Sequence, residues 1–273
     1  MVKIAVREKG QGKVLICLHG YAGSVLHWEK IAEDLSRLFK VVTPNLTRVY
    51  MGEKRLSFSQ QIDVLAQFIE NQYPQQTVFL AGISYGGALA WGLASRYPHL
   101  VDKVVLINPM PPAANRYFAM RSLRWLFSRS IPVSAIYLLI ASPFGKFFLQ
   151  QAGKVFRNFQ NEEDRLENLR GRKVQFISHI LANFSWLLHN EDWAVWTEKL
   201  QTWSHNSMLI YDRKDPVFTS EFYDGFARTL AGTNVVTTQD AGHISILQQP
   251  KLIAGAMLEY LLRDFYKEAD GYN

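Results

Sequence analysis

The sequence predicts an α/β fold, a mostly parallel sheet flanked by helices, with a helical insertion after the strand that ends near Ile107. Short apolar runs alternate with segments of helical periodicity over residues 14–107, and again from residue 207 onward. Runs that are apolar throughout are typical of parallel strands buried on both faces. The alternation stops at Asn108-Pro109, and from there to about His205 the pattern favours only helices and loops.

The predicted strands are short, apolar and partly β-branched, and helical segments separate most of them. They cover residues 14–18, 40–44, 77–83, 102–107, 207–211 and 234–238. The predicted helices have apolar side chains three or four positions apart. They cover 28–39, 59–73, the residues after 83 up to about 97, 221–230 and 250–267. Pro74 follows the second helix and is a typical stop signal.

This pattern divides the chain into a core domain of residues 1–109 and 206–273 and an inserted segment of residues 110–205. The insertion leaves the sheet at the carboxyl end of a strand. Open α/β sheets bind ligands in the crevice at that edge. We therefore expect residues 110–205 to form a helical cap, or lid, over the site.

Composition narrows the class of protein. Of 273 residues, 48% are hydrophobic and 20% are charged, which is typical of a soluble globular protein. Cys17 is the single cysteine, which excludes an internal disulfide framework and a cysteine-rich zinc site. Residues 1–13 contain no apolar stretch of signal-peptide length. The best candidate for a membrane span, residues 131–149, is broken by prolines, a glycine and a lysine. We expect a cytoplasmic protein.

The net charge of +6 is mild, but the positive charge is unevenly distributed. Between residues 103 and 157 the chain has eight basic residues, nine aromatic residues and no acidic residue. The basic residues are Lys103, Arg116, Arg121, Arg124, Arg129, Lys146, Lys154 and Arg157. Such a stretch suits an anionic ligand or a lipid headgroup layer, or is a set of helices with solvated charges. Because no zinc finger, RNP-type motif or long basic run is present, we expect no nucleic-acid partner.

The sharpest motif is Gly82-Ile83-Ser84-Tyr85-Gly86, between a predicted strand and a predicted helix. This is the context in which G-x-S-x-G forms a nucleophile elbow. The serine sits on a very tight turn, where side chains at Gly82 and Gly86 would collide with the backbone. Ser84 is therefore the candidate nucleophile, and the alternative is a glycine-rich turn with a capping serine.

A serine nucleophile needs a base, and the base needs an orienting acid. On a strand–elbow–helix scaffold the acid and then the histidine follow the serine, each in a loop after a strand. His243 occupies such a loop after the strand 234–238, whereas His205 precedes a strand and lies on the wrong side of the sheet. His243 is the candidate base, and the alternative is a loop histidine that caps the final helix.

The candidate acid is Asp215, in the loop after the strand 207–211. Asp212 competes with it, because Asp212 is closer to the strand end. If Asp212 is not the acid, we expect it to be an exposed partner of the basic residues that follow it. Asp240 lies too near His243 along the chain for an ordinary triad acid.

The loop after the strand 14–18 reads His19-Gly20-Tyr21-Ala22-Gly23-Ser24, and its glycines allow the backbone to approach a ligand closely. The backbone N–H groups of Tyr21 and Tyr85 are expected to point at one oxygen, as an oxyanion hole. We expect His19 to be structural, since it precedes a triad that is complete without it.

These motifs, HGYAGS, GISYGG, DRKDPV and AGHISILQQP, occur in the order and spacing of a known family. The chain resembles the α/β-hydrolase superfamily of the capped serine esterase, lipase and C–C hydrolase type over residues 12–108 and 206–267. The resemblance implies a nucleophile at Ser84, an acid at Asp215, a base at His243 and oxyanion donors at Tyr21 and Tyr85. It implies no metal and no organic cofactor. The chain departs from the family where Asp212 replaces the glycine that usually opens the acid loop.

The expected function is hydrolysis of a carboxylic ester or thioester with an apolar acyl or aromatic group. The same triad also suits C–C bond hydrolysis, acyl transfer to an alcohol, or a ligand-binding receptor with slow turnover. The expected partner is a small apolar ester, with peripheral contact between the basic cap and a membrane or anionic lipid.

Overall fold

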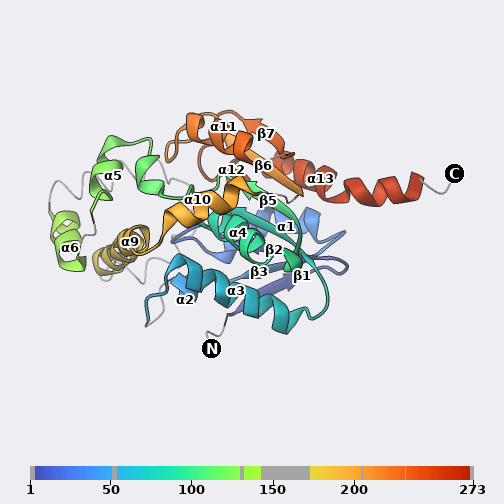
Figure 1. The fold of residues 1–273 in the computed structure, drawn as a ribbon, viewed down its shortest axis with the longest axis horizontal. Helices are drawn as coiled ribbons and strands as arrows, with labels where there is room; N and C mark the ends of the chain where they lie inside the picture. Colours follow the sequence, from blue (N-terminus) through green and yellow to red (C-terminus); the bar gives the residue numbers. More distant parts are fainter. Residues whose placement is uncertain are drawn as a thin grey trace.

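The computed structural model describes residues 4–50, 54–129, 132–142, 173–203, 206–230 and 232–270. Seven strands form one sheet in the order β1-β3-β2-β4-β5-β6-β7 (Figure 1). They are β1 (Val6–Lys9), β2 (Val14–Leu18), β3 (Lys40–Pro44), β4 (Val78–Ile83), β5 (Val101–Ile107), β6 (Asn206–Asp212) and β7 (Asn234–Thr238). β1 is antiparallel to β3, and every other neighbouring pair is parallel. The predicted mostly parallel α/β sheet is confirmed.

The sequence pattern missed β1. All four of its residues are exposed and three of them are charged, so it lacks the continuous apolar run that marks strands such as β2 and β4. It is held at the sheet edge by backbone pairing with β3, in the register Val6 to Pro44 and Lys9 to Val41. Because backbone hydrogen bonds do not depend on side-chain type, this strand has no signal in the sequence.

Five helices of the core agree with the predicted ones to within a few residues at most ends, and two short ones, α2 (Thr47–Tyr50) and α12 (Ser245–Gln248), were not predicted. The five are α1 (Glu29–Leu35), α3 (Phe58–Gln72), α4 (Tyr85–Arg96), α11 (Ser220–Thr229) and α13 (Pro250–Asp270). Short 3-10 turns are η1 (Val25–Trp28), η2 (Pro98–Leu100) and η3 (Ala114–Arg116). α3 begins with a capping box between Ser57 and Gln60, which satisfies two backbone N–H groups at its first turn.

Two apolar layers cover the two faces of the sheet. Along β2, Leu15 and Cys17 pack in the layer that contains α1 and α13. Ile16 and Leu18 point the other way, into the layer that contains α3 and α4. Both faces of the sheet are therefore shielded from water, which explains why β2 and β4 have no polar side chain.

The segment between β5 and β6, residues 110–205, is called the insertion below. Its described helices are α5 (Arg121–Leu126), α6 (Val133–Ala141), α9 (Lys173–His189) and α10 (Trp193–Gln201). α10 lies along the core near α4, whereas α5 and α6 lie at the end of the molecule opposite the C-terminus (Figure 1). Within the described ranges, no helix is long and apolar enough to span a bilayer. The segment 131–149 falls partly outside those ranges.

Hydrogen bonds at two places, together with aromatic packing of Phe58 on Trp193 and Trp196, help to attach the insertion to the core. The first is at Glu191, between α9 and α10. Its carboxylate accepts hydrogen bonds from the Ser59 backbone N–H at 3.1 Å, the Ser59 hydroxyl at 2.5 Å and Trp196 Nε1 at 2.8 Å. The second is a β-bridge between Phe118 and Phe218, in which the N–H of residue 119 donates to the carbonyl of Val217 at 2.8 Å.

Candidate active site

Ser84 lies at the turn between β4 and α4, with φ 53° and ψ −118°. A positive φ is uncommon for a residue other than glycine and often marks a functional turn. The backbone is anchored on both sides, since Ser84 N–H donates to Ile107 O at 3.0 Å and Ser84 O accepts from Met110 N–H at 2.9 Å. These bonds fix the tight turn and leave the side chain partly exposed.

The glycines on either side of Ser84 make this turn sterically possible. A Cβ atom on Gly82 would lie 2.2 Å from the carbonyl oxygen of Gly86. A Cβ atom on Gly86 would lie 2.2 Å from the carbonyl oxygen of Leu18. Real Cβ atoms do not approach backbone oxygens so closely, so both positions exclude any larger residue.

His243 follows β7 in a loop that is tightly turned at Gly242, where φ is 65°. Its Nε2 lies 2.8 Å from Ser84 Oγ, and its Nδ1 lies 2.8 Å from Asp215 Oδ2. An imidazole whose Nδ1–H donates to a carboxylate has its Nε2 lone pair free for a serine hydroxyl. The Phe218 ring stands edge-on to the imidazole at 5.6 Å and covers it from one side.

Asp215 lies in the loop between β6 and α11 and is buried. Its Oδ1 accepts hydrogen bonds from the backbone N–H groups of Val217 at 2.7 Å and Phe218 at 3.3 Å. Burial alone would raise the pKa of this carboxyl. The facing imidazole of His243 and the hydrogen bonds outweigh that effect, so the pKa of Asp215 lies below its usual value. The carboxylate therefore stays ionised.

Two further side chains contact Asp215, and the sequence analysis missed both. Tyr223 of α11 donates its hydroxyl to Oδ2 at 2.7 Å, and Asn108, at the end of β5, donates Nδ2 to the same oxygen at 2.9 Å. The position of Asn108, directly after a predicted strand, was an available signal. No sequence signal pointed to Tyr223, because only the tertiary fold brings this part of α11 next to Asp215.

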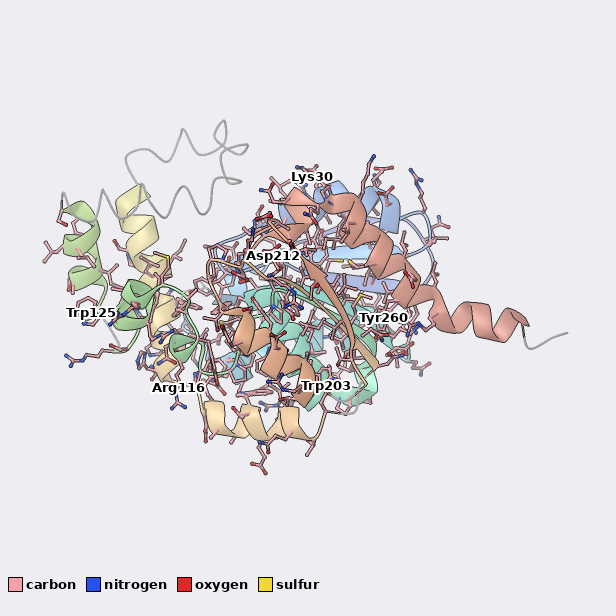
Figure 2. The ribbon with its side chains drawn as sticks, turned by 90° about the horizontal axis from the view of Figure 1, so that it is seen from above. Lys30, Arg116, Trp125, Trp203, Asp212 and Tyr260 are labelled. Atoms are coloured by element: carbon pink, nitrogen blue, oxygen red, sulfur yellow. The ribbon has the colours of Figure 1, made fainter. Side chains whose placement is uncertain are left out.

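Asp212 is not an exposed partner of the basic residues that follow it, so that expectation is wrong. Its carboxylate is fully buried inside the core (Figure 2). Oδ2 accepts from the Thr238 hydroxyl and the Ala241 N–H, both at 2.8 Å, and Oδ1 accepts from the Lys214 N–H at 2.8 Å. Asp212 thus joins the acid loop to the loop that carries the histidine, which is a structural reason for an aspartate at this position.

The loop after β2 passes directly beside Ser84. A Cβ atom on Gly20 would lie 3.3 Å from Ser84 Cβ, so the backbone at Gly20 is in tight contact with the serine. The loop turns through a hydrogen bond from Gly23 N–H to Gly20 O at 3.0 Å, and it contains Tyr21. Tyr85 is the first residue of α4, so its N–H has no acceptor within the helix.

His19 is fully buried and uses both ring nitrogens. Nδ1 lies 2.9 Å from Gly20 O, and Nε2 accepts from Leu46 N–H at 3.0 Å. Burial lowers the pKa of His19 to about 4, so the ring is neutral. This geometry ties the loop after β2 to the chain after β3 and is that of a structural residue, as expected.

Aromatic side chains from the insertion and the core gather near Ser84 and His243. Tyr21 contacts Phe184 of α9 with ring centroids 4.9 Å apart. Phe118 stacks on Phe218 at 5.4 Å, and Phe218 contacts the triad imidazole. Phe127 of the insertion packs on Phe184 at 5.3 Å. The surroundings of Ser84 are therefore largely apolar and aromatic, and the insertion supplies part of them.

The basic residues of the segment 103–157 that the structure describes do not form one continuous set. Lys103 is buried, with Nζ donating to Leu261 O at 3.0 Å, so it does not belong to a surface patch. Arg116, Arg121, Arg124 and Arg129 are exposed, and the three basic residues beyond residue 142 lie outside the described ranges, as does His205. No group of three or more His, Cys, Asp or Glu side chains within the described ranges is placed to hold a metal ion.

The fold and the site define a class: an α/β protein with a serine on a strand–helix turn and a hydrogen-bonded histidine and aspartate. A family model described as alpha/beta hydrolase fold matches residues 13–250. The chain belongs to this family.

Known proteins from several organisms are similar to the chain. A putative 2-succinyl-6-hydroxy-2,4-cyclohexadiene-1-carboxylate synthase of Bacillus subtilis is 34% identical over 40% of this chain and 42% of that protein. The matched region is thus less than half of that relative. Polyneuridine aldehyde esterase of Rauvolfia serpentina is 22% identical over 91% of this chain and 96% of that protein.

Among solved structures, a thermophilic esterase from Thermogutta terrifontis matches with a TM-score of 0.68 and 20% identity, over 95% of this chain and 93% of that one. A meta-cleavage product hydrolase of Pseudomonas fluorescens matches with a TM-score of 0.64 and 17% identity, over 96% and 94% of the two chains. These likenesses show the fold. Hydrolases and esterases recur in both sets of comparisons, which supports a hydrolase.

Proposed function

We propose that this protein is a serine hydrolase that cleaves a carboxylic ester or thioester with an apolar acyl or aromatic group. The observation that carries the proposal is the unbroken chain of two 2.8 Å contacts from Ser84 Oγ through His243 to Asp215. These are the distances at which a base can take a proton from a serine hydroxyl while a carboxylate holds the imidazole.

The reaction follows from this geometry. Ser84 Oγ attacks the acyl carbon as His243 Nε2 takes its proton, which forms a tetrahedral intermediate. The bond to the alkoxy or thiolate group then breaks, and His243 returns the proton to the leaving group. A water molecule, deprotonated by His243, attacks the acyl-enzyme and releases the acid and free Ser84. Asp215 stays ionised throughout and stabilises the imidazolium.

The backbone N–H groups of Tyr21 and Tyr85 are proposed to bind the oxyanion of the intermediate. Two features support this assignment. The loop that contains Tyr21 runs beside Ser84, and the Tyr85 N–H lies at the first position of α4. Unpaired N–H groups at a helix start favour negative charge. In comparable enzymes, one preorganised donor of this kind lowers the activation barrier by about 3 kcal/mol.

The residues 110–205 are proposed to form a cap over the site. Support comes from Phe184 and Phe118, which extend from the insertion to Tyr21 and to the Phe218 ring beside the triad. Apolar linings suit apolar ligands. The names of two similar proteins, polyneuridine aldehyde esterase and the esterase from Thermogutta terrifontis, also point to esters.

The first test is hydrolysis of p-nitrophenyl esters from acetate to palmitate by the wild type and by Ser84→Ala. We expect turnover that depends on acyl length and is lost in the variant. A fluorophosphonate probe should label the wild type but not Ser84→Ala. Labelling without ester turnover would move the proposal to C–C bond cleavage, tested with a diketone, or to acyl transfer, tested with an added alcohol. Neither turnover nor labelling would refute the enzyme and favour a ligand-binding protein.

We also propose that the insertion makes peripheral contact with an anionic lipid surface. Trp125 of α5 is 75% exposed and Leu138 of α6 is 69% exposed. Trp125 and Arg116 point away from the core at the protruding end of the molecule (Figure 2). Four exposed arginines, 116, 121, 124 and 129, belong to the same part of the chain, which has no acidic residue between 103 and 157. Exposed aromatic and leucine side chains beside arginines suit an anionic headgroup layer.

Co-sedimentation with vesicles of phosphatidylcholine, with and without phosphatidylglycerol, tests this contact. The wild type should bind the anionic vesicles, and binding should weaken with salt. The double variant W125S/L138S should lose binding while hydrolysing a short soluble ester normally. Leu252→Ser is the matched control, because Leu252 is 48% exposed on α13, away from the insertion. Equal sedimentation of the double variant and wild type would refute the contact.

A further inference from the structure

Asp215 Oδ2 receives three donors at once, which is more than orienting one imidazole requires. They are His243 Nδ1 at 2.8 Å, the Tyr223 hydroxyl at 2.7 Å and Asn108 Nδ2 at 2.9 Å. The other oxygen, Oδ1, accepts only backbone N–H groups. The two additional side chains therefore act on the same atom that faces the base.

We propose that Tyr223 and Asn108 are positioning residues that hold Asp215 Oδ2 in place and limit how strongly the His243–Asp215 pair binds a proton. The inference goes beyond the proposed hydrolase function but rests on it where activity is the readout. Neither side chain is placed to touch the substrate, because both act through the buried carboxylate.

The orientation of Asn108 is itself determined. Its backbone N–H donates to Ile210 O at 2.8 Å, and its φ is 40°, a conformation that asparagine tolerates better than most residues. The Ser245 hydroxyl donates to Asn108 Oδ1 at 3.0 Å. Because the ionised Asp215 carboxylate can only accept hydrogen bonds, the amide nitrogen must face it, which leaves Oδ1 to accept from the Ser245 hydroxyl. Asn108, directly after β5, and Tyr223 of α11 thus converge on one carboxylate, and Ser245 of α12 supports Asn108.

The charge on the His243–Asp215 pair determines in which direction the loss of a donor shifts its protonation. When His243 is neutral, Asp215 carries a buried negative charge that depends on its donors. When His243 is protonated, the imidazolium neutralises much of that charge. Donors from Tyr223 and Asn108 therefore stabilise the unprotonated pair more than the protonated pair. Removing one should make the pair take up a proton at higher pH, which removes the base that catalysis needs.

The other titratable groups that face the pair are not expected to interfere. Asp212 has its carboxylate bonded to three donors. Burial, with the nearby His19 and His243, lowers the pKa of His27 to about 4, and burial lowers that of His19 likewise. Both rings are neutral in the range where an esterase assay is run. Lys214 and Asp240 pair with each other at the surface, 2.8 Å apart.

The structure offers a matched pair of variants. Tyr223→Phe keeps the ring, which is fully buried and stacks on Tyr211 with centroids 5.0 Å apart, and removes only the hydroxyl. Tyr211→Phe removes a hydroxyl from the other ring of the same stack, but that hydroxyl donates to Asp224 instead of Asp215. A packing effect should appear in both variants, whereas an effect on the triad should appear only in the first.

The experiment measures kcat/KM against pH and, independently of turnover, titrates His243 by NMR with labelled histidine, assigned with His243→Gln. In Tyr223→Phe we expect the acid limb and the NMR midpoint to move up by about 0.5–1 pH unit, as for loss of about 1 kcal/mol of hydrogen bonding. On the acid limb, at a pH below the midpoints of both proteins, kcat should fall about threefold to tenfold, which is the same shift expressed as a rate, with KM little changed. Tyr211→Phe should match the wild type.

Asn108→Asp gives a second arm, because it replaces the donor with a carboxylate oxygen next to Oδ2 and should shift the midpoint further in the same direction. An unchanged NMR midpoint in Tyr223→Phe, or an equal shift in Tyr211→Phe, would overturn the inference. If no ester is turned over but the NMR shift is found, the proposed function fails and the positioning role stands.

Discussion

Replacing Gly86 by alanine is the sharpest test of how the turn at Ser84 is built. The added Cβ atom would lie 2.2 Å from Leu18 O, 2.6 Å from His19 O and 2.6 Å from Leu18 C. All three are backbone atoms at the end of β2, so no side chain can rotate away. Ordinary van der Waals contact begins near 3.4 Å, so either α4 or the end of β2 must move by about 1 Å.

The expected cost has two parts. Overpacking a well-packed interior costs about 1–3 kcal/mol and occasionally more. We expect Gly86→Ala to lie at the upper end of this range, because the atoms that its Cβ would meet belong to the backbone. The displaced backbone also leads into the loop with Tyr21, which is proposed to bind the oxyanion. A misplacement of about 1 Å in an active site lowers turnover by about a hundredfold. We expect a loss of about 3 kcal/mol in the free energy of unfolding and about a hundredfold in kcat/KM.

Urea denaturation followed by tryptophan fluorescence measures the first effect, and p-nitrophenyl ester hydrolysis measures the second. Gly255→Ala is the control, because Gly255 is exposed in α13 and a Cβ atom there meets nothing within 4 Å. Alanine should stabilise that helix by about 1 kcal/mol. The reasoning is refuted if Gly86→Ala unfolds within 0.5 kcal/mol of the wild type, a margin about the size of ordinary surface effects, and keeps full activity.

Three further predictions concern stability. Asp212→Ala leaves three donors unpaired, two of them buried, and should cost about 3 kcal/mol in urea denaturation. Asp240→Asn at the surface keeps a residue that tolerates the positive φ of 62° and should change the free energy of unfolding by less than about 0.5 kcal/mol. Equal effects would contradict the assigned role of Asp212. The free energy of unfolding should fall as the pH is lowered from 6.5 toward 4. The pKa values of His19 and His27 are lowered from 6.5 to about 4 in the folded protein, so in this pH range only the unfolded chain takes up protons on these two histidines. Each histidine contributes up to about 3 kcal/mol, and a free energy of unfolding that does not change over this range would refute the prediction. Glu191→Ala removes two hydrogen bonds between the insertion and the core and one within the insertion, so amide exchange in α10 should accelerate by about tenfold while exchange in β4 does not change; unchanged exchange in α10 would show that the insertion is held by other contacts.

The main features of the fold were readable from the sequence because burial on both faces of a parallel sheet leaves a local signal. Strands such as β4 are apolar at every position, and the helices between them carry apolar residues at helical spacing. The order of serine, aspartate and histidine along the chain was readable for a similar reason. Each lies in a loop after a strand, and parallel strands present those loops at one edge of the sheet.

β1 shows the limit of this signal. Its four exposed residues pair with β3 mainly through the backbone, with one ion pair between Glu8 and Lys40 at 3.0 Å, and backbone bonding is the same for every residue type except proline. The helical insertion was predicted as a class of structure, but its contacts were not. The hydrogen bonds of Glu191 join positions more than a hundred residues apart, and no periodicity encodes such a pair.

The sequence by itself determined that a serine, a histidine and one of two aspartates belong to a common edge of the sheet. Only the tertiary structure shows that Asp215, and not Asp212, contacts His243. Both are buried and hydrogen-bonded, and they are three positions apart. The loop between them turns through a bond from Asp215 N–H to Asp212 O at 3.2 Å, which sends one carboxylate toward Thr238 and the other toward His243. Both candidates are aspartates in the same loop, so residue type does not distinguish them. The path of the loop backbone determines which carboxylate reaches His243.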